Sequence, residues 1–178
     1  MSLTFAYADP PYPGQSAKHY ADHPDYAGEV NHAALVDDLL DYAGWALSTH
    51  VAGLFLVQRI LCDRGLEVSK DYRVMVWVKP FAAFKRNVKV AYTWEPVFVR
   101  SVRTPEPGMG MEVLRDHVAE PIARGSGVVG AKPERFCRWL FEVAGLDRSD
   151  TFVDLFPGSG AVTRAHERWC RERPLVLP

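Results

Sequence analysis

The most informative stretch of this chain is LTFAYADPPY, at residues 3–12. Its first half is aromatic and apolar, which is typical of a buried strand, and its two consecutive prolines end that strand in a rigid turn. A second stretch, TFVDLFPGSG at residues 151–160, has the same organisation, with a glycine-rich turn after the strand. Because ligands of open α/β sheets bind beyond the carboxyl ends of the strands, both turns are candidate parts of one site.

Helical patterns separate the apolar strands. Asn31 is a good N-cap for the first helix, which Gly44 is expected to end. Thr49 is the expected cap of the second helix and Gly65 its stop signal. The face that this second helix is expected to bury contains Val51, Leu54, Phe55, Gln58 and Leu61. The predicted helices cover residues 32–43, 51–61, 132–144 and 161–169.

Strand patterns alternate with these helices. They are short and rich in β-branched and aromatic residues. The predicted strands cover residues 3–8, 45–48, 73–78, 91–99, 151–156 and 175–177. Alternation of strand and helix indicates an α/β fold, in which a mostly parallel sheet has helices on both faces.

Length and composition limit the class of protein. A chain of 178 residues with 48% hydrophobic residues is long enough for one buried core, so we expect one domain. The net charge of −1 argues against a protein that coats nucleic acid electrostatically, so any nucleic-acid contact must be local. Three widely spaced cysteines fit a reduced protein with ordinary core cysteines. Neither an export signal nor a membrane-spanning run is found, and we expect a cytoplasmic location.

The glycine-rich turn is a candidate cofactor cradle. Gly158 and Gly160 allow a tight turn and close approach of a ligand to the backbone. The helix that follows offers free N–H groups to a carboxylate or a phosphate. By itself, such a turn is compatible with several nucleotide cofactors and also with an ordinary connection.

The turn at residues 9–12 carries a sharper chemical signal. Its two prolines have no N–H, so the turn offers oxygens only, from the Asp9 side chain and the Pro10 carbonyl. Two such acceptors suit an NH₂ group, because they take both of its hydrogens and stabilise the positive charge that develops when it attacks. Tyr12 offers a flat face on which a base can stack. The alternative interpretation is an ordinary turn with a solvent-facing aspartate.

Together, the two turns resemble the signature motifs of DNA amino methyltransferases, which act on adenine N6 or cytosine N4. The catalytic motif comes first and the cofactor loop last, which resembles the circularly permuted β class and short methylase-like proteins of phages and actinobacteria. Residues 77–80, 94–97 and 130–133 (WVKP, WEPV and GAKP) resemble further motifs of that class in the same order. An aspartate in the first motif is more typical of the adenine enzymes. The resemblance implies a Rossmann-like methyltransferase fold that uses S-adenosylmethionine.

The resemblance also implies a reaction, in which the N6 amine of adenine in DNA takes the sulfonium methyl group by direct in-line attack. The catalytic residues would be Asp9, Pro10, Pro11 and Tyr12. The cofactor-binding residues would be Asp154, Leu155, Phe156, Pro157, Gly158, Ser159 and Gly160, with Lys132 as partner of the methionine carboxylate.

The single domain at 1–178 would then have a catalytic half at 1–100, a connector at 101–131 and a cofactor half at 132–178. The connector is too short for the recognition domain of the sequence-specific enzymes. The acidic residue that binds the cofactor ribose in the family has no counterpart after the predicted strand at 175–177. The short connector suggests a short or relaxed recognition sequence, a specificity partner, or a substrate other than duplex DNA. The missing acid suggests weak cofactor affinity or contacts from a second subunit.

Nucleic-acid contacts are expected from two segments. The loop at residues 13–31 can close over an extruded base, and it contains His19, Tyr20, His23 and Tyr26. Metal binding by the two histidines is disfavoured because no third ligand accompanies them, so we predict no metal site. The other segment is residues 79–103, which is rich in cations and contains a single acid, Glu95. Its cations are Lys79, Lys85, Arg86, Lys89, Arg100 and Arg103. It is a candidate for phosphate contacts, and equally for a solvated surface.

Two other functions remain open at the level of the sequence. The same chemistry suits RNA, cytosine N4 or a protein amide as substrate. A catalytically silent module that keeps the fold and binds nucleic acid or a partner is the alternative from a different class.

Overall fold

The computed structural model describes residues 2–12, 28–80, 89–103, 113–122 and 131–172. The elements of these ranges, in chain order, are β1 (Thr4–Ala8), α2 (His32–Leu40), β2 (Gly44–Ser48), the 3-10 helix η1 (Val51–Gly53), α3 (Leu54–Asp63), β3 (Arg73–Val78), β4 (Trp94–Arg100), β5 (His117–Ala119), α4 (Glu134–Val143), β6 (Thr151–Asp154) and α5 (Ala161–Glu172). No helix in the described ranges has the length and apolar character needed to cross a bilayer.

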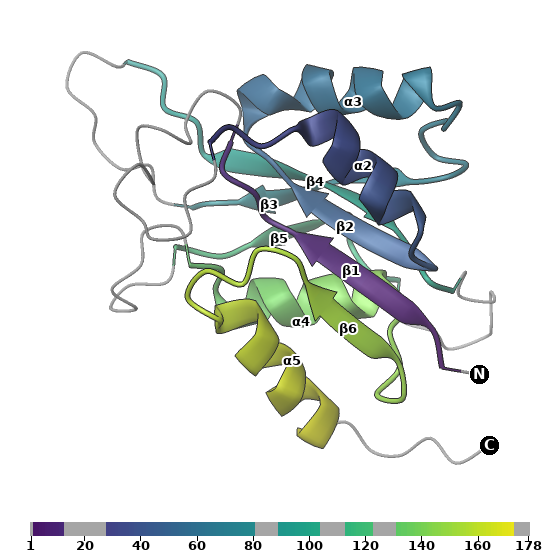
Figure 1. Ribbon diagram of the computed structural model, residues 1–178. Helices are drawn as coiled ribbons and strands as arrows, with labels where there is room; N and C mark the ends of the chain where they lie inside the picture. Colours follow the sequence, from purple (N-terminus) through teal and green to yellow (C-terminus); the bar gives the residue numbers. More distant parts are fainter. Residues whose placement is uncertain (1, 13–27, 81–88, 104–112, 123–130, 173–178) are drawn as a thin grey trace.

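The strands form one six-stranded sheet in the order β5-β3-β4-β2-β1-β6. β4 runs antiparallel to both of its neighbours, whereas every other pair is parallel. Five strands therefore point the same way and β4 alone is reversed. α2 and α3 cover one face of the sheet, and α4 and α5 cover the other (Figure 1). This is the predicted Rossmann-like α/β class, with a mostly parallel sheet between two helical layers.

Side chains of β1 alternate between the two layers, as the two-residue period of a strand requires. Phe5 and Tyr7 belong to the cluster that includes α4 and α5, whereas Ala6 and Ala8 face α2 and α3. All four side chains are completely buried. Because both faces of β1 are covered, its sequence is continuously apolar, and this is the pattern from which the strand was predicted.

Most of the predicted elements are present near their expected bounds. β1, β2, β3 and β6 lie within one or two residues of the predicted strands. Asn31 caps α2 as expected, since its side-chain oxygen accepts hydrogen bonds from the N–H groups of Ala33 and Ala34, both at 3.1 Å. The prediction for Gly44 is wrong, because α2 ends at Leu40 and Gly44 is the first residue of β2.

The helix predicted at residues 51–61 exists, but its details differ from the prediction. It begins with η1, which His50 precedes, and no side chain caps that turn; the Thr49 hydroxyl has no hydrogen-bond partner among the described residues. The predicted buried face is partly right: Leu61 is buried and Leu54 packs against the same core cluster, but Phe55 is 77% exposed. The residues of α3 that are buried are Val57, Ile60 and Leu61.

Three further expectations need correction. β4 starts at Trp94, three residues later than predicted. β5 lies inside the segment interpreted as a connector, and its three residues were not predicted as a strand. Cys62 is exposed and so is not a core cysteine, whereas Cys137 is buried as expected. The predicted strand at 175–177 lies outside the described residues.

Candidate active site

The carboxyl ends of the five parallel strands meet at one edge of the sheet, and the reversed strand β4 begins there. Tyr7 in β1 lies opposite Asp154 in β6, and the N–H of Leu155 donates to the Tyr7 carbonyl at 2.9 Å. The turns that follow β1 and β6 therefore leave the sheet side by side. Helices α2, α3, α4 and α5 all begin at this edge (Figure 1), so their N-terminal partial positive charges converge on it.

Asp9 is the first polar side chain after β1, and its two oxygens have different surroundings. Oδ2 lies 2.9 Å from Nζ of Lys132. Oδ1 is buried and has no hydrogen-bond partner among the described residues. Burial raises the pKa of Asp9, and Lys132 opposes part of that shift. A buried acceptor without a donor is costly, so Oδ1 is a place where a donor from a ligand would be stabilised.

Lys132 lies just before α4 and is enclosed, with its side chain 4% exposed. Its Nζ is also 3.5 Å from Oε2 of Glu95. The same ammonium lies over the rings of Trp77, at 5.1 Å from the centroid, and of Phe136, at 5.9 Å. Burial by itself would lower the pKa of Lys132, but Asp9 and Glu95 outweigh burial and the pKa is raised. Lys132 is therefore a charged bridge between two carboxylates.

Glu95, in β4, connects this bridge to the tyrosine of the catalytic motif. It forms an ion pair with Lys79 as well as with Lys132, and it accepts a hydrogen bond from the Tyr12 side chain. Burial raises the pKa of Glu95, but the two lysines outweigh it, so the pKa is lowered overall. The ring of Tyr12 stacks on His50, with centroids 4.9 Å apart and planes 4° apart. Tyr12 is thus fixed both at its hydroxyl and at one face.

The glycine-rich turn follows β6. Oδ2 of Asp154 accepts a hydrogen bond from the Thr163 hydroxyl at 3.0 Å, whereas Oδ1 is buried without a partner among the described residues. Burial raises the pKa of Asp154. Gly158 and Gly160 have φ values of 47° and 69°, in the left-handed region that favours glycine. α5 starts directly after this turn, at Ala161, so the turn leads a ligand to free N–H groups.

Only some of the residues expected to contact nucleic acid lie in the part of the chain that the structure describes. Lys79 is 16% exposed and its charge is paired with Glu95, so it does not form an open phosphate site. Arg103 forms an ion pair with the buried Asp150. Arg100 is the last residue of β4 and lies opposite Trp45, near the start of β2, in the strand register, so it is at the other edge of the sheet from the candidate site. Lys89 is exposed. The predicted contacts His19, Tyr20, His23, Tyr26, Lys85 and Arg86 lie outside the described residues.

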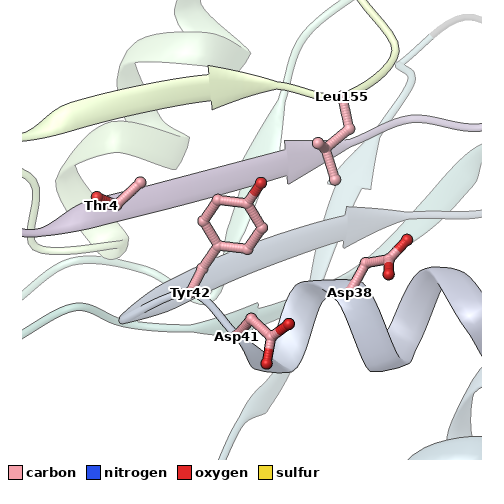
Figure 2. Close-up of a pocket in the computed structure, with 5 residues that line it drawn as sticks. All are labelled: Thr4, Asp38, Asp41, Tyr42 and Leu155. Atoms are coloured by element: carbon pink, nitrogen blue, oxygen red, sulfur yellow. The ribbon is translucent and has the colours of Figure 1, made fainter.

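A separate surface cavity of about 440 Å³ lies on the α2 side of the sheet. Figure 2 shows the ring of Tyr42 lying along β1, between Thr4 and Leu155, with two aspartates on the α2 side. Its lining residues are Thr4, Asp38, Asp41, Tyr42 and Leu155. The lining carries no cation and includes neither Asp9 nor the two glycines of the turn. Leu155 is its one residue from the predicted cofactor-binding set, so the structure places that side chain on the α2 side of the sheet.

Sequence reasoning missed the roles of Glu95 and His50. Glu95 stood in the sequence as the one acid among several cations and as part of the WEPV motif, but neither signal predicted its contacts with Lys132 and Tyr12. His50 had no signal, because its stacking on Tyr12 depends on how β1 and β2 end next to each other. Trp77 was noted as part of a motif, but its position under the Lys132 ammonium was not predicted.

Comparison with known proteins bears on the fold. The sequence matches no family model and no curated protein. Among solved structures 21 chains match this one. One is the crystal structure of the M1.HpyAVI–SAM complex, which matches with a TM-score of 0.61 and 16% sequence identity over 94% of this chain and 78% of that chain. At this level of identity the match establishes the shared fold.

Proposed function

We propose that this chain transfers a methyl group from S-adenosylmethionine to the exocyclic N6 amine of adenine in DNA. The observation that carries the proposal is Oδ1 of Asp9, which is buried at the sheet edge beside the turn of Asp154 and has no hydrogen-bond partner in the part of the chain that the structure describes. A carboxylate oxygen there suits a donor with hydrogens to give, and an exocyclic amine is such a donor. The M1.HpyAVI–SAM complex, which shares the fold, was solved with SAM.

The proposed chemistry follows from the acceptors that the chain offers. The lone pair of an exocyclic amine is delocalised into the ring, so the amine is a poor nucleophile. Asp9 Oδ1 and the Pro10 carbonyl accept its two hydrogens, which favours a tetrahedral nitrogen and stabilises the positive charge that develops on it. A bond forms between nitrogen and the methyl carbon as the bond from that carbon to sulfur breaks, and the extra proton leaves afterwards. No covalent intermediate with the protein is required, so catalysis rests on positioning and electrostatics.

The turn after β6 fits the cofactor that supplies the methyl group. S-adenosylmethionine, when bound, supplies an electrophilic methyl on a sulfonium, and its methionine part carries an amine and a carboxylate. The Asp154 carboxylate, whose Oδ1 has no side-chain partner among the described residues, is a candidate acceptor for that amine. The left-handed turn at Gly158 and Gly160, and the start of α5 behind it, suit the carboxylate. Phe156 is partly buried next to this turn and is a candidate contact for the adenine ring.

A nucleic-acid substrate is supported by the surface around Asp9. The convergent helix starts favour a polyanion at this edge. Exposed apolar side chains also occur here, at the start of α3 and just before β4: Phe55 is 77% and Tyr92 is 74% exposed. Aromatic side chains of this kind stack on unpaired bases, at about 1–3 kcal/mol for each base. A base inside a duplex cannot reach Asp9, so we expect an extruded or single-stranded adenine.

The experiment that tests the proposal is methyl transfer from radiolabelled S-adenosylmethionine to DNA and RNA, followed by digestion to nucleosides. We expect N6-methyl-2′-deoxyadenosine from the DNA digest. Asp9→Asn should lower kcat by about 100-fold or more, which is the usual cost of a lost electrostatic contact to the transition state. Cofactor affinity in calorimetry should stay close to that of the unchanged protein, because Asp9 acts on the amine.

The matched control is Asp38→Asn, since Asp38 is an exposed aspartate of α2 that lines the separate cavity. It should keep full activity. Label in N4-methylcytosine or only in RNA would replace the proposed substrate, and full activity of Asp9→Asn would remove the proposed role of Asp9. Absence of any cofactor binding would favour a silent module.

A further inference from the structure

We propose that Lys132 and Glu95 are positioning residues that fix the orientation and the charge of the Asp9 carboxylate. The inference rests on the proposed function for its catalytic consequence, but not for its physical test. It differs from the role that resemblance gives Lys132, which is to hold the methionine carboxylate. The structure places the Lys132 ammonium on Asp9 and Glu95 instead.

The first argument is geometric. Nζ of Lys132 lies 2.9 Å from Oδ2 of Asp9, whereas Oδ1 accepts no hydrogen bond from any described residue. A carboxylate with one oxygen held cannot rotate freely, so its other oxygen has a defined direction. That direction is what an amine needs if both of its hydrogens are to meet acceptors at once. Lys132 therefore selects which oxygen of Asp9 meets the substrate.

The second argument concerns what holds Lys132 in place. Its side chain is 4% exposed, and the rings of Trp77 and Phe136 lie against the ammonium. Trp77 is itself fixed, because its indole N–H donates to the Glu120 carbonyl at 2.8 Å. Glu95, 12% exposed, provides the second carboxylate at 3.5 Å. A nearly buried ammonium with two anionic partners is held in place by both of them, so Lys132 stays beside Asp9.

The third argument is electrostatic, and it concerns every charged or titratable group that acts on Asp9. Lys132 and Lys79 favour the ionised carboxylate, and Glu95 opposes it. Asp154 and Tyr7 also interact with Asp9 through their charges. Because Lys132 and Glu95 have opposite signs, removing each charge must shift the titration of Asp9 in opposite directions.

The test is a carboxyl ¹³C NMR titration of the full chain labelled at aspartate, with the Asp9 signal identified by its loss in Asp9→Asn. In Lys132→Met the Asp9 midpoint should rise, by about one pH unit or more. In Glu95→Gln it should fall. Arg135→Met is the matched control, because Arg135 lies in the first turn of α4, is 73% exposed and pairs with Glu120 at 3.7 Å. That control should leave the midpoint unchanged.

Activity measurements then separate positioning from cofactor binding. In Lys132→Met we expect kcat to fall by about 100-fold, and the acid limb of the pH–rate profile to move upward with the Asp9 midpoint. The dissociation constant of S-adenosylmethionine should change less than about threefold. Lys132→Arg keeps the charge, so it should restore the position of the acid limb even where kcat recovers only in part.

Two outcomes overturn the inference. One is an Asp9 midpoint that stays unchanged, or moves in the same direction, in Lys132→Met and Glu95→Gln. The other is a loss of cofactor affinity of about tenfold or more in Lys132→Met, with the acid limb unmoved, which would return Lys132 to the methionine carboxylate. If Lys132→Met does not fold, Glu95→Gln still tests the required fall of the Asp9 midpoint, and Lys132→Arg, which keeps the charge, must leave that midpoint close to its original value. The NMR titration needs no turnover, so a chain without methyl transfer would end the proposed function and still test this inference.

Discussion

Tyr12 shows how a single side chain is prepared before any substrate arrives. Its hydroxyl donates to Glu95 and one face of its ring lies on His50. In the proposed reaction the ring would stack on the base, and a tyrosine held in this way loses less side-chain freedom on stacking than a mobile one would. His50 therefore supports a residue of the candidate site.

Replacing His50 tests this support. His50→Ala should raise the KM for an oligonucleotide by about 3- to 10-fold, in line with the usual contribution of an aromatic pair, and should change kcat less. His50→Phe keeps a flat ring and should restore KM. Steady-state kinetics with one oligonucleotide, at saturating cofactor, measures both effects. An unchanged KM in His50→Ala would show that Tyr12 needs no support from that side.

The sequence predicted those site residues whose role follows from their immediate neighbours in the chain. It did not predict the residues whose role depends on contacts with distant parts of the chain. Asp9 and Pro10 stood out because two prolines remove donors from a turn, which needs no knowledge of the fold. Glu95 lies 86 positions later, on a strand whose reversed direction the sequence did not reveal. The partners of Lys132 could not be predicted, because they depend on which strand ends beside α4.

Among the elements, α2 was predicted well because its start depends on one residue. Asn31→Ala removes the side-chain oxygen that accepts from two N–H groups, so it should lower the free energy of unfolding by about 1 kcal/mol. Asn31→Asp and Asn31→Ser also carry a side-chain oxygen that can accept these hydrogen bonds, so their free energies of unfolding should stay close to that of the original protein. Urea unfolding followed by circular dichroism measures the difference. Equal stability of the alanine and aspartate variants would show that the cap contributes nothing.

α3 was predicted less well, for a reason of helical geometry. The 3-10 helix η1 comes directly before α3. Each residue of η1 advances by about 120° around the axis, rather than the 100° of an α-helix. Three such residues rotate the rest of the helix by about 60°, so an apolar face counted from Val51 is no longer the face toward the sheet. Phe55 becomes exposed and Val57 becomes buried. β5 escaped prediction because three residues are too few to display a two-residue period.

For the molecule as a whole, Asp150 ties together parts of the chain that are far apart in sequence. Its buried carboxylate accepts from the N–H of Leu3 at 2.9 Å, from the N–H of Asp147 at 2.8 Å and from the Arg103 guanidinium. Burial raises the pKa of Asp150, but these donors outweigh it and lower the pKa to about 2. The start of β1, the end of β4 and the start of β6 thus depend on one ionised group.

This group makes the stability of the fold depend on pH. A pKa lower in the folded than in the unfolded chain gives stability that is complete above about pH 4 and is lost as the pH falls toward 2. The contribution is about 2 kcal/mol of unfolding free energy. Asp150→Asn should have a lower free energy of unfolding at pH 7, and it should not show this part of the decrease in stability as the pH falls. Asp63→Asn, at an exposed position of α3, is the control and should follow the unchanged protein in urea titrations between pH 7 and pH 2.

If the unfolding free energy of Asp150→Asn decreased with falling pH as much as that of the original protein, then carboxylates other than Asp150 would be responsible for the decrease. The expected difference between the two curves is largest near neutral pH and vanishes in strong acid. This convergence distinguishes the titration of one residue from a general loss of packing, which would separate the curves by the same amount at every pH.

The pairing of β1 with β6 also has a consequence for synthesis. β1 leaves the ribosome early, yet the hydrogen bond from Leu3 to Asp150 spans 147 positions. At ordinary translation rates the nascent chain must wait on the order of ten seconds for its late partner. During that time one edge of β1 is an unpaired, strongly apolar strand, the kind that associates with other chains. A ribosome that stalls before residue 150 would release a polypeptide carrying the Asp-Pro-Pro-Tyr loop without the strand and turn that complete the site.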